Sequence, residues 1–93
     1  MSIIYEEHSL FHGRPPSPNA DATKAWLRHY DNALLLRWLA QHKAATFTER
    51  RQAEKELEIA ERKMRYWQRH PNYVPSEALA GAADLKMRWK ETH

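Results

Sequence analysis

The chain has 93 residues and no cysteine, which excludes a disulfide framework, a thiolate metal site and a cysteine nucleophile. Fifteen lysines and arginines stand against twelve aspartates and glutamates, and a net charge of +3 is small for a protein dedicated to binding a polyanion. A chain this short has little room for an enclosed active-site cavity, and no stretch approaches the roughly 20 apolar residues of a membrane span. We therefore expect one small cytoplasmic domain over residues 1–93, held together by apolar packing.

Residues 1–19 are predicted to form an arm and a linker outside a helical core at 20–93. The run RPPSPN contains three prolines, which favour extended backbone. Before it, SIIYEEHSLFHG has the charge order of a short helix, although IIY also suits an edge strand. His8 and His12 would share a face of that helix, but two histidines without a third ligand do not make a metal site. No metal and no cofactor is expected.

A long first helix is predicted at about 20–44, where cap candidates precede a run without glycine or proline. Its apolar residues surround the helix, so it should be central and covered from several directions. We assign one face to the intramolecular core: Leu27, Tyr30, Leu34 and Trp38. A second arc, formed by Leu35, Leu36 and Leu39, is expected to stay uncovered within the monomer.

A second helix is predicted at about 48–70, because Thr46 and Glu49 have the spacing of a capping box. Apolar residues then repeat at alternating intervals of four and three, which favours antiparallel packing on the first helix. The members of this seam are Ala53, Leu57, Ala60, Met64 and Trp67. The opposite side is charged and should face water. It carries Lys55, Glu58, Arg62, Arg65 and Arg69.

Pro71 ends the second helix, and HPNYVP is predicted to be a connector. A third helix is expected at about 76–90, with Ser76 as its N-cap. Its apolar stripe consists of Ala78, Ala82, Leu85 and Trp89. The predicted fold is all-α: an antiparallel helical hairpin with a third, C-terminal helix and a short N-terminal helix or extended arm.

The basic and aromatic crowding in KMRYWQRHPNYVP has two interpretations. Cations at the carboxyl end of a helix complement its dipole, so the stretch can simply be the end of the second helix and its connection to the third. Alternatively, Tyr66, His70 and Tyr73 contribute to a contact patch, since tyrosine offers a large area at a small entropic cost. The flank that begins at Ile59 and Lys63 can likewise receive the third helix or a partner.

Catalysis is not expected, because no nucleophile, base or carboxylate pair converges in the sequence. The three aspartates lie near caps or on polar helix faces, and His29 and Asp31 are not neighbours on a helix surface. Nucleic-acid binding is the alternative function. It would use Arg62, Lys63, Arg65 and Arg69 along the basic end of the second helix. Glutamates at 54, 58 and 61 interrupt that surface.

The preferred hypothesis is a non-enzymatic protein-binding module, because the first helix has more apolar surface than its neighbours can easily cover. The predicted contact residues are Leu35, Leu36, Leu39, Tyr66, His70 and Tyr73. Self-association is the simplest way to cover them, and docking on a larger protein is the next. Small helical proteins of this class often serve as regulators or inhibitors carried by phages or other mobile elements, which is an analogy of size and class.

Overall fold

A computed structural model describes residues 18–92, which form three helices: α2 (Ala22–Gln41), α3 (Phe47–Gln68) and α4 (Pro75–Thr92). The protein is all-α, and the three helices predicted for residues 20–93 are confirmed, with ends displaced by a few residues. The short helix or strand predicted near the N-terminus, and the pair His8 and His12, lie outside the described residues.

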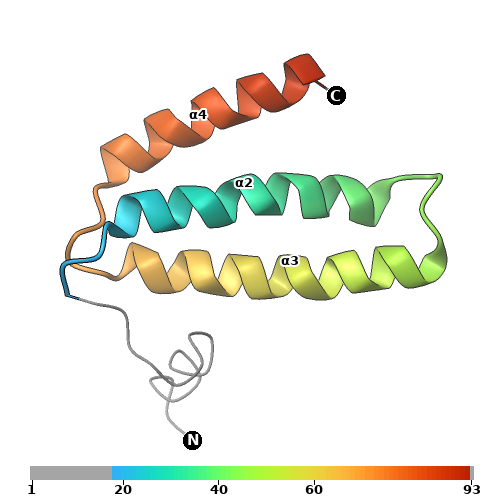
Figure 1. Ribbon diagram of the computed structural model, residues 1–93, viewed down its shortest axis with the longest axis horizontal. Helices are drawn as coiled ribbons and strands as arrows, with labels where there is room; N and C mark the ends of the chain where they lie inside the picture. The colour runs from blue at the N-terminus through green and yellow to red at the C-terminus, as the bar shows by residue number, and fades with distance from the viewer. Residues whose placement is uncertain (1–17, 93) are drawn as a thin grey trace, which may run out of the picture.

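The three helices lie side by side in one layer, with α2 in the middle (Figure 1). Helix α3 runs antiparallel to α2 along one side, and α4 packs on the other side and diverges from α2 toward its C-terminal end (Figure 1). The molecule measures 41 × 33 × 15 Å. Its thinnest dimension is little more than the diameter of one helix, about 10–12 Å with side chains. No helix within residues 18–92 carries an apolar run that could cross a bilayer.

Helices α2 and α3 begin at side-chain caps. Asp21 accepts the backbone N–H of Lys24 at 3.0 Å. The predicted capping box is present, with Thr46 Oγ1 accepting from Glu49 N at 3.1 Å and Glu49 Oε1 accepting from Thr46 N at 3.0 Å. Helix α4 begins at Pro75, one residue before the predicted cap Ser76, because proline is preorganised for the first helical position.

The core between α2 and α3 corrects the assignment of Leu36. Leu36 is only 5% exposed and packs with Ala53 and Ala60 of α3, and Leu39 lies partly buried beside this cluster. The expectation that Leu36 belongs to an uncovered arc is therefore wrong. The predicted seam of α3 is confirmed, since four of its residues join this cluster and the fifth, Trp67, is buried nearby.

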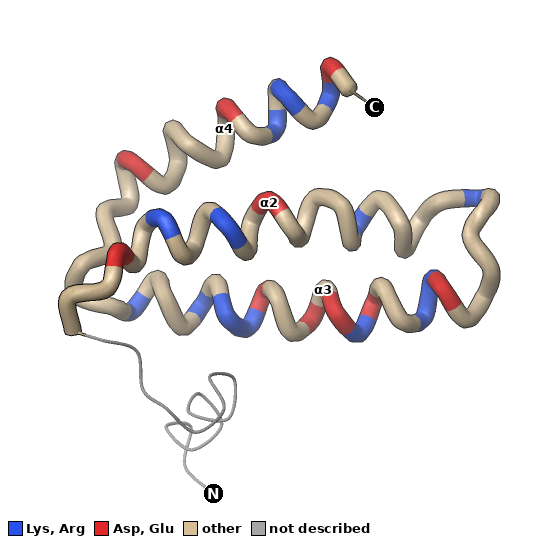
Figure 2. Tube along the Cα trace, in the orientation of Figure 1, with Lys and Arg blue, Asp and Glu red and all other residues tan. Residues whose placement is uncertain are grey.

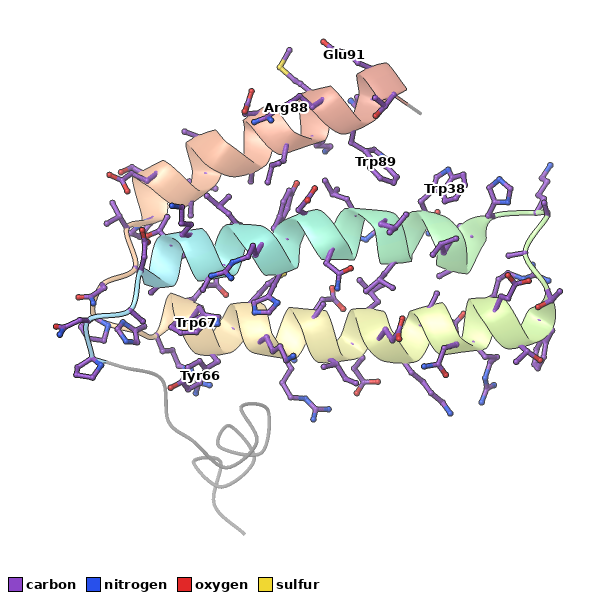
Figure 3. All side chains as sticks on the ribbon, in the orientation of Figure 1. Trp38, Tyr66, Trp67, Arg88, Trp89 and Glu91 are labelled. Atoms are coloured by element: carbon purple, nitrogen blue, oxygen red, sulfur yellow. The ribbon has the colours of Figure 1, made fainter. Side chains whose placement is uncertain are left out.

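The face that begins at Leu27, predicted to belong to the intramolecular core, packs against α4. Leu27 lies directly against Gly81 of α4. The rings of Trp38 and Trp89 meet edge to face at 6.4 Å between centroids, at the far ends of α2 and α4 (Figure 3). Helix α2 thus has two apolar seams on opposite sides, and each one packs against a different neighbour.

The connector HPNYVP fastens the start of α2 to the start of α4. Asn72 Nδ2 donates to the carbonyl oxygens of Pro18 and Ala20 at 2.9 and 3.0 Å. The N–H of Val74 donates to Thr23 Oγ1 at 2.8 Å. A buried cluster that includes Trp26, Trp67 and Ala78 fills the same end of the layer. The stretch that drew attention in the sequence therefore has a structural role here.

Candidate interaction surface

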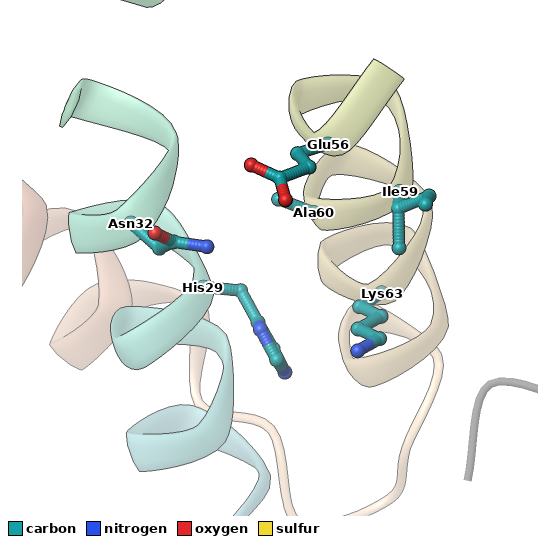
Figure 4. A pocket seen from close by; sticks show the side chains of 6 residues that line it. All are labelled: His29, Asn32, Glu56, Ile59, Ala60 and Lys63. Atoms are coloured by element: carbon teal, nitrogen blue, oxygen red, sulfur yellow. The ribbon is translucent and has the colours of Figure 1, made fainter. Parts of the chain in front are cut away.

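A groove runs between α2 and α3 on one face of the layer. It consists of two adjoining hollows of about 390 and 400 Å³, which share Glu56. The first is lined by His29, Asn32, Glu56, Ile59, Ala60 and Lys63 (Figure 4). The second is lined by Leu39, Thr48, Glu49, Gln52, Ala53 and Glu56. We call this feature the α2–α3 groove.

Small residues create the floor of the groove. Ala53 and Ala60 are 4% and 3% exposed, and they lie seven residues apart on the inner side of α3. Two helical turns separate them, so both side chains point at α2 and leave room above them where a longer side chain would fill the space. Leu39 and Ile59 add apolar walls.

Four polar side chains point into the first hollow. Asn32 and Glu56 extend toward one another from α2 and α3, with His29 and Lys63 beside them (Figure 4). Burial lowers the pKa of His29, and the positive charges of Lys63 and Arg28 lower it further. His29 is therefore neutral at pH 7, where its imidazole can both donate and accept a hydrogen bond.

The groove has a charge gradient along its length. Arg28 and Lys63 lie toward the N-terminal end of α2, whereas Glu49 and Glu56 lie nearer the N-terminal end of α3. Because the two helices are antiparallel, one end of the groove is basic and the other acidic. Figure 2 shows basic residues gathered near the C-terminal end of α3, whereas basic and acidic residues are mixed along its N-terminal half.

Exposed apolar side chains border the groove on both helices. Ile59 is 43% exposed and lines the first hollow. Leu35 is 40% exposed. It follows Asn32 by three residues and precedes Leu39 by four, so it shares their face of α2. The other face of the pair is different, since an ion pair with a nitrogen-to-oxygen distance of 3.8 Å joins Arg37 to Glu61.

The residues predicted for partner binding lie in different surroundings. Leu35 is exposed and Leu39 lines the groove, but Leu36 is core. Tyr66 and His70 share a hollow of about 260 Å³ near the C-terminal end of α3, and both rings contact Trp67. Tyr73 packs edge to face on Trp26. The structure therefore does not gather the six residues into one patch.

Of the four cations of the alternative nucleic-acid surface, Lys63 is separated from the other three. Lys63 lies in the groove, while Arg62 NH2 is 3.3 Å from Glu58 Oε1 in an ion pair along α3. Arg65 is four residues after Glu61, and Arg69 lies at the C-cap of the helix. Arg62, Arg65 and Arg69 follow one another at intervals of three and four and share the outer side of α3, whereas Lys63 is turned away from them toward the groove.

Sequence reasoning missed His29, Asn32 and Glu56 as groove residues. Their signal was a largely polar stripe beside the apolar seam of α3, whose members follow one another at intervals of three and four. The stripe contains Glu49, Gln52, Glu56, Ile59 and Lys63. Only its last two members were recognised as a flank that can receive a neighbour, because the polar residues before them resembled an ordinary solvated face.

No cluster of three or more metal-ligating side chains occurs in the part of the chain that the structure describes. Comparison of the sequence and the fold with known protein families, with curated proteins and with solved structures gives no significant match.

Proposed function

We propose that the protein is a non-enzymatic protein-binding module whose contact surface is the α2–α3 groove with Leu35 and Ile59. The observation that carries this proposal is the exposure of two large apolar side chains on either side of a preformed groove, on one face of a one-layer fold. Domains usually bury their apolar faces between two packed layers, so this face is suited to receive a second layer from a partner.

The shape of the groove favours a protein partner over a small ligand. Small-molecule sites usually enclose most of their ligand, whereas this groove is open along the length of two helices. A protruding side chain of the partner can pack against the alanines at the floor of the groove, as a knob packs into a hole, and the side chains of Leu35 and Ile59 would be buried around it. Asn32, His29, Glu56 and Lys63 would then select the partner by hydrogen bonds and charge.

A module of this kind fits a regulator or inhibitor that acts by covering a surface of another protein. Such a role requires only complementarity, because binding alone blocks the covered surface. The polar groups of the groove suit such a role, because an amide, an imidazole, a carboxylate and an ammonium on an open surface can form hydrogen bonds and ion pairs with a partner.

Site-specific photo-crosslinking tests the proposal. A photoreactive side chain at position 35 or 59 should form covalent adducts with the bound partner protein, and mass spectrometry of the crosslinked peptides identifies them. The variant Ile59→Glu should lose the adduct formed from position 35. The control position is 62, on the outer side of α3. Equal yields from positions 35, 59 and 62 would contradict the proposal.

A further inference from the structure

We infer that the partner of the α2–α3 groove is a second copy of this chain, placed face to face with its helices antiparallel to those of the first. The two copies would be related by a twofold axis that lies between the faces and runs across α2 and α3. This inference rests on the proposed function, because it names the partner of the same surface.

The charge gradient of the groove selects this arrangement. An axis across the helices places the basic end of one copy, at Arg28 and Lys63, over the acidic end of the other, at Glu49 and Glu56. An axis along the helices would place like charge on like charge. Self-complementarity of this kind is what an isologous dimer requires, since each contact occurs twice.

The apolar residues lie where the axis would pass. Leu35 belongs to the middle part of α2, and Ile59 to the middle part of α3. A twofold axis near the centre of the face brings these side chains toward their counterparts and removes them from water. The small residues Ala53 and Ala60 let the second layer approach closely at the same place.

The size of the face is sufficient for a reversible dimer. The layer is 41 Å long and 33 Å wide, and most of this face belongs to α2 and α3. Two adjacent helices of 20 and 22 residues, each about 30 Å long and about 10–12 Å across, present a strip of roughly 600–800 Å². A standard interface takes about 800 Å² from each partner. The outer side of α4 also exposes Leu79 and Met87, at 70% and 65%, but a single helix provides a narrower strip.

Sedimentation velocity of the purified full chain, from about 5 to about 500 µM, tests the inference. We expect a concentration-dependent monomer–dimer equilibrium. Leu35→Glu and Ile59→Glu should each weaken the dimer at least about tenfold, since a carboxylate would be buried near the axis. Leu79→Glu and Met87→Glu are matched controls and should leave the dissociation constant unchanged. Circular dichroism confirms that each variant is folded.

A charge exchange tests the orientation. Lys63→Glu alone and Glu56→Lys alone should each weaken the dimer several-fold, because each brings like charges together across the axis. The double variant should recover much of the lost affinity, since the complementarity is restored with the signs exchanged. Additive losses in the double variant would contradict the antiparallel arrangement.

The remaining outcomes separate the two proposals. A chain that stays monomeric, while positions 35 and 59 crosslink to a different protein, would overturn self-association and leave the proposed function standing. A monomer without such adducts would overturn both. Dissociation by Leu79→Glu or Met87→Glu, with no effect of Ile59→Glu, would place the dimer contact on α4 and contradict the inference.

Discussion

One hydroxyl group joins the beginning of α2 to the beginning of α4. Thr23 is 5% exposed, and its Oγ1 accepts the hydrogen bond from the backbone of Val74. Thr23→Val keeps the shape of the side chain but removes the acceptor, which should cost about 1–3 kcal/mol by leaving that N–H without a partner. Thr23→Ser retains the hydroxyl and should lose less. Urea unfolding measures both, and equal stability of Thr23→Val and the parent chain would contradict the prediction.

His29 should make the stability of the fold depend on pH. Burial is the largest cause that lowers the pKa of His29 below its ordinary 6.5, and the positive charges of Lys63 on α3 and of Arg28 on its own helix lower it further. The carboxylate of Glu56 shares the hollow. The folded state therefore binds fewer protons than the unfolded state. The resulting stability is fully present above about pH 6.5 and is lost as the pH falls through the lower pKa of the folded state.

The measurement is the melting temperature between about pH 7.5 and 5, compared between the parent chain and His29→Gln. The parent should lose more stability on acidification than the variant, because only the parent carries the group with the lowered pKa. The difference should be modest, since His29 is only half-buried and solvent screens its neighbours. Identical pH profiles would contradict the assignment.

At the scale of the helix, adjacent leucines of α2 should behave differently. Leu36 is packed against α3, so Leu36→Ala should cost about 2–5 kcal/mol of unfolding free energy. Leu35 is 40% exposed, and in the monomer Leu35→Ala should cost about 1 kcal/mol or less. Chemical denaturation at low protein concentration separates the two. Equal losses would mean that Leu35 also belongs to the monomer core.

The close approach of α4 to α2 depends on Gly81. A Cβ atom there would lie 2.7 Å from Leu27 Cδ1 and 2.8 Å from Cδ2. Gly81→Ala should leave the unfolding free energy nearly unchanged. The cost of moving the Leu27 methyl groups is offset by a gain of about 1 kcal/mol in helix propensity. Gly81→Val should cost about 1–3 kcal/mol through overpacking. Thermal unfolding compares the two variants, and a stable Gly81→Val would show that α4 can shift freely.

The three helices could be predicted from the sequence because their boundaries are local. Caps, prolines and the regular seam of α3 depend on neighbouring residues, and charges cover the rest of that helix. The partners of the faces of α2 could not be assigned in the same way. This helix is apolar on opposite sides, so its periodicity does not indicate which side meets α3. That is why Leu36 was placed outside the core.

For the whole molecule, the single layer predicts unequal local stability. Helix α2 is packed on both sides, whereas α4 has substantial contacts with α2 alone. Native-state hydrogen exchange should therefore show lower opening free energies for the amides of α4 than for those in the middle of α2 and α3. Equal protection of all three helices would contradict this expectation.

The groove itself follows from this arrangement and not from any local pattern. His29 and Lys63 are distant in the sequence and meet only because α2 and α3 are antiparallel and in register. The flank that includes Ile59 and Lys63 could be recognised from helical spacing. Whether that flank would be covered by the third helix depended on α4, which packs on the other side of α2 and leaves the groove open.

The fastening of the chain at one end of the layer has a mechanical consequence. The start of α4 is held to the start of α2 by Asn72, Thr23 and the cluster around Trp26. This end of the layer is therefore a hinge point from which α4 extends. Helix α4 has 18 residues and is about 27 Å long, so a rotation of about 10° about the hinge point would move its C-terminal end by about 5 Å. Trp89 lies near that end, against Trp38. The contact between the two indole rings therefore reports the angle between α4 and α2.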